Sequence, residues 1–237
     1  MTSAWTLLSW GPDGWADEFA WGVFITLSLA VATLPIGLAA GFGIALAKRS
    51  EEPSLRLAAN IYTTIFRGLP ELLTLFLVYF GFQIGLQALV RLWIPDAAIE
   101  VNSFVSGMVA LGVVFSAFAS EVFLSAFRAI PRGQYEGGYA IGLTASQTML
   151  LVILPQLLRI ALPGLANQWM ILVLNTSLVS AIGLSDILRQ ASIAARVTRE
   201  PLLFFGVATL LYLALSVLSS IALGGLERRM GRSGVRR

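Results

Sequence analysis

Long uncharged runs of mostly apolar residues dominate the chain, and short segments between them carry its charges. A helix needs about 20 apolar residues to cross a hydrocarbon core of about 30 Å. Five runs reach this length, and they predict spans at residues 19–47, 66–90, 103–127, 164–184 and 202–226. The pattern therefore predicts an all-α integral membrane protein with five transmembrane helices.

A sixth uncharged run covers residues 137–158 and is 22 residues long, so its length alone would also let it span. It differs from the other runs because it contains three glycines, a proline and several polar residues. Hydropathy alone does not decide between five and six spans, and the distribution of charge is needed.

Basic residues decide the topology, because cytoplasmic loops of membrane proteins carry an excess of Lys and Arg. With five spans and the N-terminus outside, 12 basic residues lie inside and 4 outside. The inside set is Lys48, Arg49, Arg56, Arg67, Arg128, Arg132, Arg159, Arg228, Arg229, Arg232, Arg236 and Arg237, and the outside set is Arg91, Arg189, Arg196 and Arg199. Six spans would leave 9 against 7. We therefore expect five spans, an external N-terminus, a cytoplasmic C-terminus and a cytoplasmic loop at 131–159.

Composition agrees with the membrane prediction and excludes several kinds of chemistry. The chain of 237 residues is 57% hydrophobic and 12% charged, with a mean hydropathy of +0.81, and a soluble domain could not bury so much apolar surface. The absence of His and Cys excludes the usual zinc and haem sites and triad catalysis. The only lysine, Lys48, follows Ala47, so the chain has no Gly-Lys-Ser/Thr phosphate loop. We expect no catalytic residue, no metal and no nucleic-acid partner.

The cytoplasmic apolar loop must be covered, because an exposed apolar patch of this size marks a protein contact. Gly142 is expected to end a first short helix, and Pro155 and Pro163 are expected to punctuate the segment after it. The loop is predicted to be a helix–turn–helix docked on another protein. The alternative is a loop that packs only on its own chain.

This loop is similar to the EAA loop of the membrane subunits of ABC importers. The family pattern is Glu-Ala-Ala, three residues, Gly, nine residues, Ile, one residue, Leu-Pro. The chain matches its spacing without gaps at Glu136, Gly137, Gly138, Gly142, Val152, Leu154 and Pro155. The departures are two glycines in place of the two alanines and Val152 in place of Ile. Each glycine should weaken the first helix by about 1 kcal/mol.

Further segments resemble the polar-amino-acid branch of these permeases, particularly the Q-type subunit for histidine, arginine or opines. They are FRGLPELLTLFLVYFG (66–81), ALPGLANQW (161–169), TSLVSAIGL (176–184), VTREP (197–201) and LERR (226–229). The likeness covers roughly residues 20–230. One departure is Leu174, where the branch usually has Lys, so no role of that lysine is carried over.

The resemblance implies a type I importer permease fold with five core helices, in the bacterial inner membrane. It also implies a dimer of ATPase subunits that hold ATP and Mg²⁺, a second permease (paralogue or copy), and a periplasmic solute-binding protein. The six residues Glu136, Gly137, Gly138, Gly142, Leu154 and Pro155 would couple this chain to the ATPase. The chain itself would be no enzyme and bind no cofactor.

Polar groups at membrane depth are costly and usually face a bundle interior or a path. The candidates for a substrate path are Glu71, Glu121, Gln168, Asn175, Thr176 and Ser180. Glu121 either attracts a cationic ligand or pairs with Arg128 or with a neighbouring helix. Glu71 either joins the path or is favoured by the dipole of the helix that it opens, paired with Arg67.

The small and polar faces of the fourth span have two interpretations. Gly164, Gln168 and Asn175 share one helical face, and Thr176, Ser180 and Gly183 share the next. Such faces either pack helices closely or line a ligand path.

Three further segments complete the predicted organisation. Residues 186–199 form an amphipathic helix on the outer surface, which either anchors at the interface or meets the binding protein. Residues 1–18 are an external N-terminal segment, 19–226 the permease domain and 227–237 a basic cytoplasmic tail.

Taken together, these features predict a permease subunit that translocates a polar or basic amino acid or an opine. The alternative is an ATP-independent secondary transporter or channel, which would favour inverted repeats or charged coupling residues at the midplane.

Overall fold

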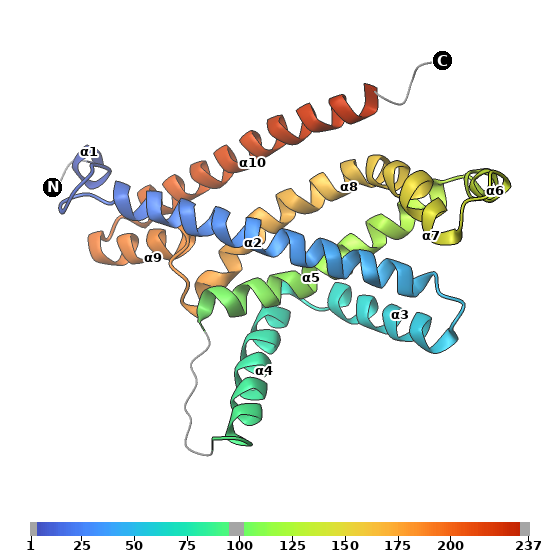
Figure 1. Ribbon diagram of the computed structural model, residues 1–237. Helices are drawn as coiled ribbons and strands as arrows, with labels where there is room; N and C mark the ends of the chain where they lie inside the picture. The colour runs from blue at the N-terminus through green and yellow to red at the C-terminus, as the bar shows by residue number, and fades with distance from the viewer. Residues whose placement is uncertain (1–3, 95–101, 233–237) are drawn as a thin grey trace. The chain divides into compact units, whose positions relative to one another are not determined.

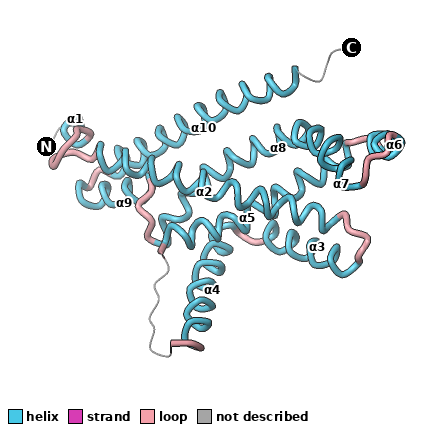
Figure 2. Tube along the Cα trace, in the orientation of Figure 1, coloured by secondary structure: helices cyan, strands magenta, loops and turns pink. Residues whose placement is uncertain are grey.

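The computed structural model describes residues 4–94 and 102–232, and these residues form helices and connecting loops without a strand (Figure 2). The first three residues of the predicted N-terminal segment and the last five of the basic tail lie outside the described residues. The element order is α1 (Ala4–Leu7), α2 (Ala16–Lys48), α3 (Pro53–Gly68), α4 (Glu71–Arg91), α5 (Ser103–Ala129), α6 (Arg132–Ala140), α7 (Ala145–Gln147), η1 (Thr148–Ile153), α8 (Leu154–Asn175), η2 (Thr176–Ile182), α9 (Ile187–Thr198) and α10 (Pro201–Arg232) (Figure 1).

Five helical segments are long and apolar enough to cross a membrane, which confirms the predicted number. They are Ala16–Lys48, Glu71–Arg91, Ser103–Ala129, Ala145–Ile182 and Pro201–Arg229. The first, third and fifth agree with the predicted spans within a few residues. The second and fourth differ, and each difference has a local cause.

The second span begins later than predicted, because the helix is interrupted at Pro70. Helix α3 ends at Gly68, and Pro70 has extended backbone angles (φ −57°, ψ 131°) before α4 begins at Glu71. Proline disfavours a helical conformation at the residue before it. Residues 66–68 therefore belong to α3, a helix that the hydropathy pattern did not predict.

The fourth span is part of a continuous helical segment from Ala145 to Ile182, which includes residues assigned to the loop. Pro163 lies inside α8 and does not interrupt it, so its predicted role as a break was wrong. Pro155 follows a π-helical turn, η1. Proline lacks an N–H donor, and π-turns accommodate such local irregularities in a helix.

The described chain divides into two compact units. Unit 1 comprises Met1–Ile36, Leu69–Val114 and Ile171–Leu218, and unit 2 comprises Gly37–Gly68, Phe115–Met170 and Ser219–Arg237. Unit 1 has a core of aromatic and small residues in which Phe19 stacks on Phe204 at 6.2 Å between ring centroids. In unit 2 the helices approach closely at Gly41, where a side-chain carbon would lie 2.9 Å from the Ala119 methyl.

Helix α9 has the predicted amphipathic pattern, but a different partner. Ile187, Ala191 and Ala194 are fully buried in the core of unit 1, and Arg196 and Arg199 are exposed. The apolar face is covered by the chain's own residues, including Phe204. The interpretation of α9 as a lipid anchor was therefore wrong for this face.

Candidate functional site

A tight turn joins α6 to α7 in unit 2 and is built around Gly142. This residue has φ +84°, in the left-handed region that glycine adopts without steric cost. Its N–H donates to the carbonyl of Tyr139 at 3.0 Å, and the N–H of Leu143 donates to the carbonyl of Gly138 at 3.1 Å. These bonds satisfy carbonyls at the end of α6, and the predicted helix end at Gly142 is confirmed.

The second arm of the turn begins with a capping box. The backbone N–H of Gln147 donates to Thr144 Oγ1 at 3.3 Å, and the backbone N–H of Thr144 donates to Gln147 Oε1 at 2.9 Å. This reciprocal pair satisfies two donors at the helix start. Thr144 and Gln147 have the spacing of a capping box, so the sequence contains a signal for this helix start that was missed.

The two arms pack closely on each other. Gly138 is buried, and a side-chain carbon there would lie 2.6 Å from the Thr148 methyl, so α6 and η1 meet at a position that only glycine fits. Gln156 Nε2 donates to Gln134 Oε1 at 2.9 Å and ties α8 to α6. Figure 1 shows α6 and α7 beyond the start of α8. The predicted helix–turn–helix is thus a defined unit.

Large apolar side chains of this helix–turn–helix remain exposed. They are Tyr139, Ile141, Leu150 and Leu151, with Ile141 76% and Leu151 66% exposed. Glu136 and Pro155 are exposed too, and Leu154 is partly buried. The chain's own packing therefore leaves apolar area uncovered on both arms.

A cavity of about 560 Å³ lies within unit 2. It is lined by Arg67, Phe118, Glu121, Val122, Ser125, Ala126, Ala129, Ile160, Gly164 and Gln168. Two candidates for the path, Glu121 and Gln168, are thus brought together from α5 and α8. Gly164 lets α8 approach α5 there, since a side-chain carbon would lie 2.7 Å from Val122.

The Glu121 carboxylate is held by two cations, Lys48 and Arg67. It forms an ion pair and hydrogen bond with Lys48 Nζ at the end of α2, and Arg67 Nη1 lies 3.3 Å from it. The Lys48 side chain is 5% exposed and that of Glu121 is 31% exposed. Glu121 thus pairs with a neighbouring helix, one of the expected alternatives, and not with Arg128. The pair expected between Arg67 and Glu71 was wrong, because Arg67 contacts Glu121. We call Lys48, Glu121 and Arg67 the ion cluster.

Aromatic rings contact the guanidinium groups of both Arg67 and Arg49. Arg67 Cζ lies 5.5 Å from the centroid of Phe118, and Arg49 Cζ lies 4.0 Å from that of Phe127. Arg49 Nη2 also donates to the Tyr135 hydroxyl at 3.2 Å. In the sequence, Lys48 and Arg49 indicated only topology, and their contacts were missed because the partners are distant in the chain.

The remaining path candidates lie in unit 1. Thr176 is fully buried, and its hydroxyl donates to the Val173 carbonyl at 2.7 Å. Thr176–Ile182 form a 3₁₀ helix that ends at Gly183 with φ +93°, so the α-helical face expected for Thr176, Ser180 and Gly183 was wrong. Asn175 precedes this helix, and Glu71 opens α4, both partly buried.

Asp186 is a buried carboxylate that the candidate residues did not include. It caps α9 by accepting a hydrogen bond from the Arg189 N–H at 2.9 Å, and the Tyr212 hydroxyl donates to it at 3.2 Å. Burial raises the pKa of Asp186 to about 6, against the lowering effect of these hydrogen bonds. An Asp directly before an amphipathic helix is a sequence signal for this N-cap.

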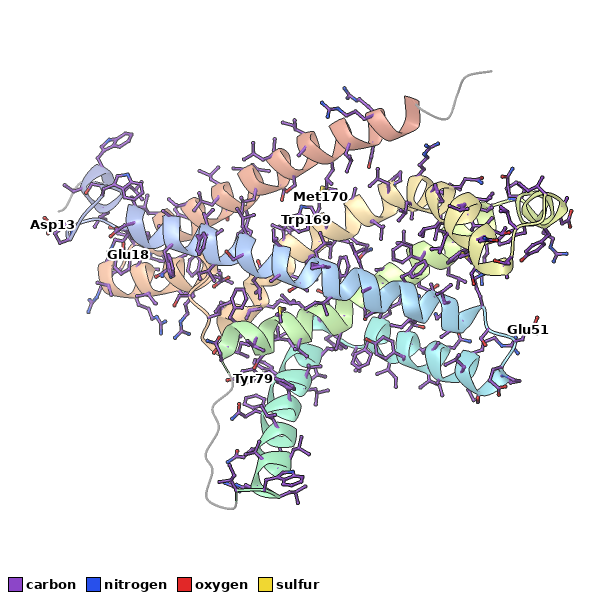
Figure 3. The ribbon with its side chains drawn as sticks, in the orientation of Figure 1. Asp13, Glu18, Glu51, Tyr79, Trp169 and Met170 are labelled. Atoms are coloured by element: carbon purple, nitrogen blue, oxygen red, sulfur yellow. The ribbon has the colours of Figure 1, made fainter. Side chains whose placement is uncertain are left out.

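Within the described ranges 4–94 and 102–232, no three acidic side chains gather as a metal site would require. Polar contacts there join helices instead. Trp169 of α8, labelled in Figure 3, donates its indole N–H to Ser219 Oγ of α10 at 3.2 Å.

Comparison with known proteins agrees with this geometry. Residues 34–232 match the family model of binding-protein-dependent transport system inner membrane components. The chain is 40% identical to the nopaline transport system permease protein NocQ of Agrobacterium fabrum, covering 91% of this chain and 92% of that protein. It is 36% identical to the arginine ABC transporter permease protein ArtQ of Haemophilus influenzae, covering 88% and 91%.

Solved structures give the same result for the fold. An amino acid ABC transporter crystallised with histidines superposes with a TM-score of 0.76 at 29% identity, covering 90% of this chain and 94% of that chain. The inward-facing MetNI methionine ABC transporter superposes with a TM-score of 0.71 at 19% identity, covering 91% and 97%, a likeness of fold.

Proposed function

This chain belongs to the family of binding-protein-dependent transport system inner membrane components, and we propose that it imports a polar or basic amino acid or an opine. It is a multi-pass permease subunit of an ABC importer in the bacterial inner membrane. The substrate class rests on relatives that are named for nopaline and arginine transport. A second permease, a paralogue or a copy, and a periplasmic solute-binding protein would complete the pathway.

The helix–turn–helix at α6 and α7 is proposed as the contact with a separate ATPase, which would hold ATP and Mg²⁺. One observation carries this proposal: both arms expose large apolar side chains, with Ile141 at 76%, although the turn itself is well ordered by hydrogen bonds. An exposed apolar patch on a defined element is typical of a protein interface. Glu136, Gly137, Gly138, Gly142, Leu154 and Pro155 would shape this contact.

The cavity of unit 2 is proposed as part of the translocation path. Glu121 and Gln168 line it beside Arg67, and polar groups at membrane depth usually serve a path or a bundle interior. Glu71, Asn175, Thr176 and Ser180 remain candidates for the path in unit 1.

The proposed ATPase contact can be tested with a matched pair of substitutions. Ile141→Asp places a charge in the apolar patch, and Leu92→Asp does the same at a residue of similar exposure, 78%, that follows α4. We expect Ile141→Asp to lower co-purification of the ATPase subunit and ATP-driven uptake at least tenfold, because a buried unpaired charge costs several kcal/mol at an interface. Leu92→Asp should leave co-purification unchanged.

The same preparation separates the import function from the alternative. Proteoliposomes with the second permease, the ATPase and the binding protein would be assayed for uptake of radiolabelled arginine, octopine and nopaline, with and without ATP. Uptake that persists without ATP or the ATPase would favour a secondary transporter or channel. Normal co-purification of the ATPase with the Ile141→Asp variant would instead contradict the proposed docking surface.

A further inference from the structure

The end of α2 places two consecutive basic residues in two different sets of contacts. Lys48 pairs with Glu121 of α5, which lines the cavity. Arg49, the next residue, contacts Phe127 near the end of α5 and Tyr135 in α6. One peptide bond therefore joins a residue of the ion cluster to a residue that contacts the helix–turn–helix.

The contacts of Arg49 hold its guanidinium between two rings. Its Cζ lies 4.0 Å from the Phe127 centroid and 5.9 Å from that of Tyr135, and Nη2 donates to the Tyr135 hydroxyl at 3.2 Å. Phe127 is buried and cannot move without disturbing its neighbours. Tyr135 directly precedes Glu136 in α6. Arg49 is therefore stacked on a fixed ring and bonded to the helix that carries the proposed docking residues.

We propose that Arg49 is a positioning residue that transmits movement of α6 to the ion cluster, and thereby links the ATPase to the cavity. The proposal rests on the proposed function, because it needs the ATPase to act on α6. Adjacent Cα atoms are about 3.8 Å apart across a rigid planar peptide. A shift of α6 that moves the backbone of Arg49 therefore also displaces the backbone of Lys48.

Such a shift would move the ion cluster from one arrangement of its ion pairs to another, without stable arrangements between them. Its two cations share one carboxylate, and the Lys48 side chain is 5% exposed. Withdrawing Lys48 from Glu121 would leave a buried charge uncompensated, which is strongly unfavourable. The cluster therefore has either a closed arrangement or one in which Lys48 finds another environment and Arg67 alone holds Glu121. Packed elements with two such arrangements convert small shifts into conformational switches.

Substitutions at both ends of the contact test the transmission. Arg49→Gln removes the charge and the stacking, Arg49→Lys keeps the charge, and Tyr135→Phe removes only the hydroxyl. Arg56→Gln is the matched control, because Arg56 is an exposed arginine of the neighbouring helix α3. The double variant of Arg49→Gln and Tyr135→Phe should be no worse than Arg49→Gln alone if the two residues act as one contact.

The readout is chemical access to the cavity. Ser125 is exposed and lines the cavity, and the chain has no cysteine of its own. Ser125→Cys would be introduced into each variant, and the complex with ATPase and second permease would be labelled with a water-soluble maleimide, with and without a non-hydrolysed ATP analogue. A structural role of Arg49 would change assembly, whereas transmission changes the response of the labelling rate to nucleotide.

We expect nucleotide to change the labelling rate in the otherwise unaltered chain. Arg49→Gln should reduce that change by about 2- to 30-fold while the ATPase still co-purifies, Arg49→Lys and Tyr135→Phe should reduce it less, and Arg56→Gln should not. A full nucleotide response in Arg49→Gln overturns the inference, as does loss of ATPase co-purification, which would make Arg49 a docking residue. Failure of the ATPase to co-purify with the unaltered chain would instead contradict the proposed function.

Discussion

Two adjacent glycines of α6, Gly137 and Gly138, have different surroundings, although both match alanine positions of the EAA pattern that the loop resembles. A side-chain carbon at Gly137 would meet nothing within 4 Å, whereas one at Gly138 would lie 2.6 Å from the Thr148 methyl and 2.8 Å from its hydroxyl oxygen. Thr148 is fully buried, and its hydroxyl has no hydrogen-bond partner within 4–94 and 102–232. The larger side chain of Thr148 thus takes the space that Gly138 leaves.

We expect Gly137→Ala to be stabilising and Gly138→Ala to be destabilising. Alanine in a helix is favoured over glycine by up to about 1 kcal/mol, but overpacking at a buried contact costs about 1–3 kcal/mol. Thr148→Ala removes both clashing atoms, so the double variant of Gly138→Ala and Thr148→Ala should recover most of the loss. The measurement is the midpoint of thermal unfolding in detergent. It is compared for Gly137→Ala, Gly138→Ala, Thr148→Ala and the double variant. Equal changes of the unfolding midpoint in Gly137→Ala and Gly138→Ala would show that α6 and η1 do not pack this closely.

Asp186 predicts a pH dependence of stability with a defined sign. Burial raises its pKa from the ordinary value of 3.8 to about 6, so the folded protein holds its proton more tightly than the unfolded chain. The stabilisation is fully present below about pH 4 and is lost as the pH rises through about 6. At most about 3 kcal/mol is involved, since one pKa unit corresponds to about 1.4 kcal/mol.

Asp186→Asn isolates this contribution from those of other groups. Asparagine is a good N-cap and keeps an oxygen for the Arg189 N–H, but it does not titrate. The difference in unfolding midpoint between this variant and the unaltered chain, measured from about pH 4 to about pH 8, should grow in favour of asparagine between about pH 4 and about pH 6 and level off above that. A difference that stays constant with pH would contradict the assignment.

At the scale of elements, the turn after α6 depends on backbone conformation and not on space. Gly142 has φ +84°, and a side-chain carbon there would meet nothing within 4 Å. Gly142→Val should therefore distort the turn, because β-branched residues resist positive φ, whereas Gly142→Asn should retain it. We expect Gly142→Val to lower ATPase stimulation at least fivefold and Gly142→Asn to lower it less than twofold, with both reaching the membrane. Comparable activity of the two variants would exclude a role for this turn.

The sequence predicted the elements whose signal is local. Apolar runs of sufficient length indicated the five spans, Gly142 indicated the turn, and the spacing of Ile187, Ala191 and Ala194 indicated the apolar face of α9, although not that the chain's own core covers it. Helix α3 was missed, because it carries charges and is not one of the spans, and hydropathy indicates only long apolar helices. The 3₁₀ helix after Asn175 was missed, because small and polar residues fit either helical period.

Contacts between distant residues could not be predicted in the same way. Glu121 was expected to attract a ligand or to pair with Arg128 or a neighbouring helix, but the sequence did not identify its partner, Lys48, which is 73 residues away in the chain. The choice among arginines and the one lysine depends on which helix ends meet, and the periodicity of single helices does not contain that information. The contact of Arg49 with Tyr135, 86 residues apart, was missed for the same reason.

At the scale of the whole molecule, the asymmetry of basic residues predicts the orientation in the membrane. Excess Lys and Arg should face the cytoplasm, which places Ser146 inside and Val197 outside. Both residues are exposed, and the chain lacks cysteine, so Ser146→Cys and Val197→Cys give clean single labelling sites. An impermeant maleimide added to intact cells whose outer membrane is permeable should label Val197→Cys alone. Labelling of Ser146→Cys by reagent added outside the cells would contradict the predicted topology.

The ion cluster determines how the charge of Glu121 affects both stability and transport. Glu121→Gln keeps the shape of the side chain but leaves Lys48, 5% exposed, without its carboxylate. Breaking a buried pair by removing one partner costs about 3–5 kcal/mol. We therefore expect a lower unfolding midpoint for Glu121→Gln and for Lys48→Gln. The double variant should recover part of the loss, because the only charge it leaves without its cluster partner is that of Arg67, whose side chain is 44% exposed.

Transport by the same variant distinguishes a structural carboxylate from one that attracts cations. Two cations already neutralise Glu121, so its field at the cavity is largely cancelled. Uptake by Glu121→Gln should therefore fall by a similar factor for cationic arginine and for an amino-acid ligand whose side chain is neutral, in parallel with reduced assembly. Arg56→Gln, which changes an exposed charge of α3, should affect neither. A selective loss of arginine uptake in a normally assembled complex would instead show that Glu121 receives the cationic group of the ligand.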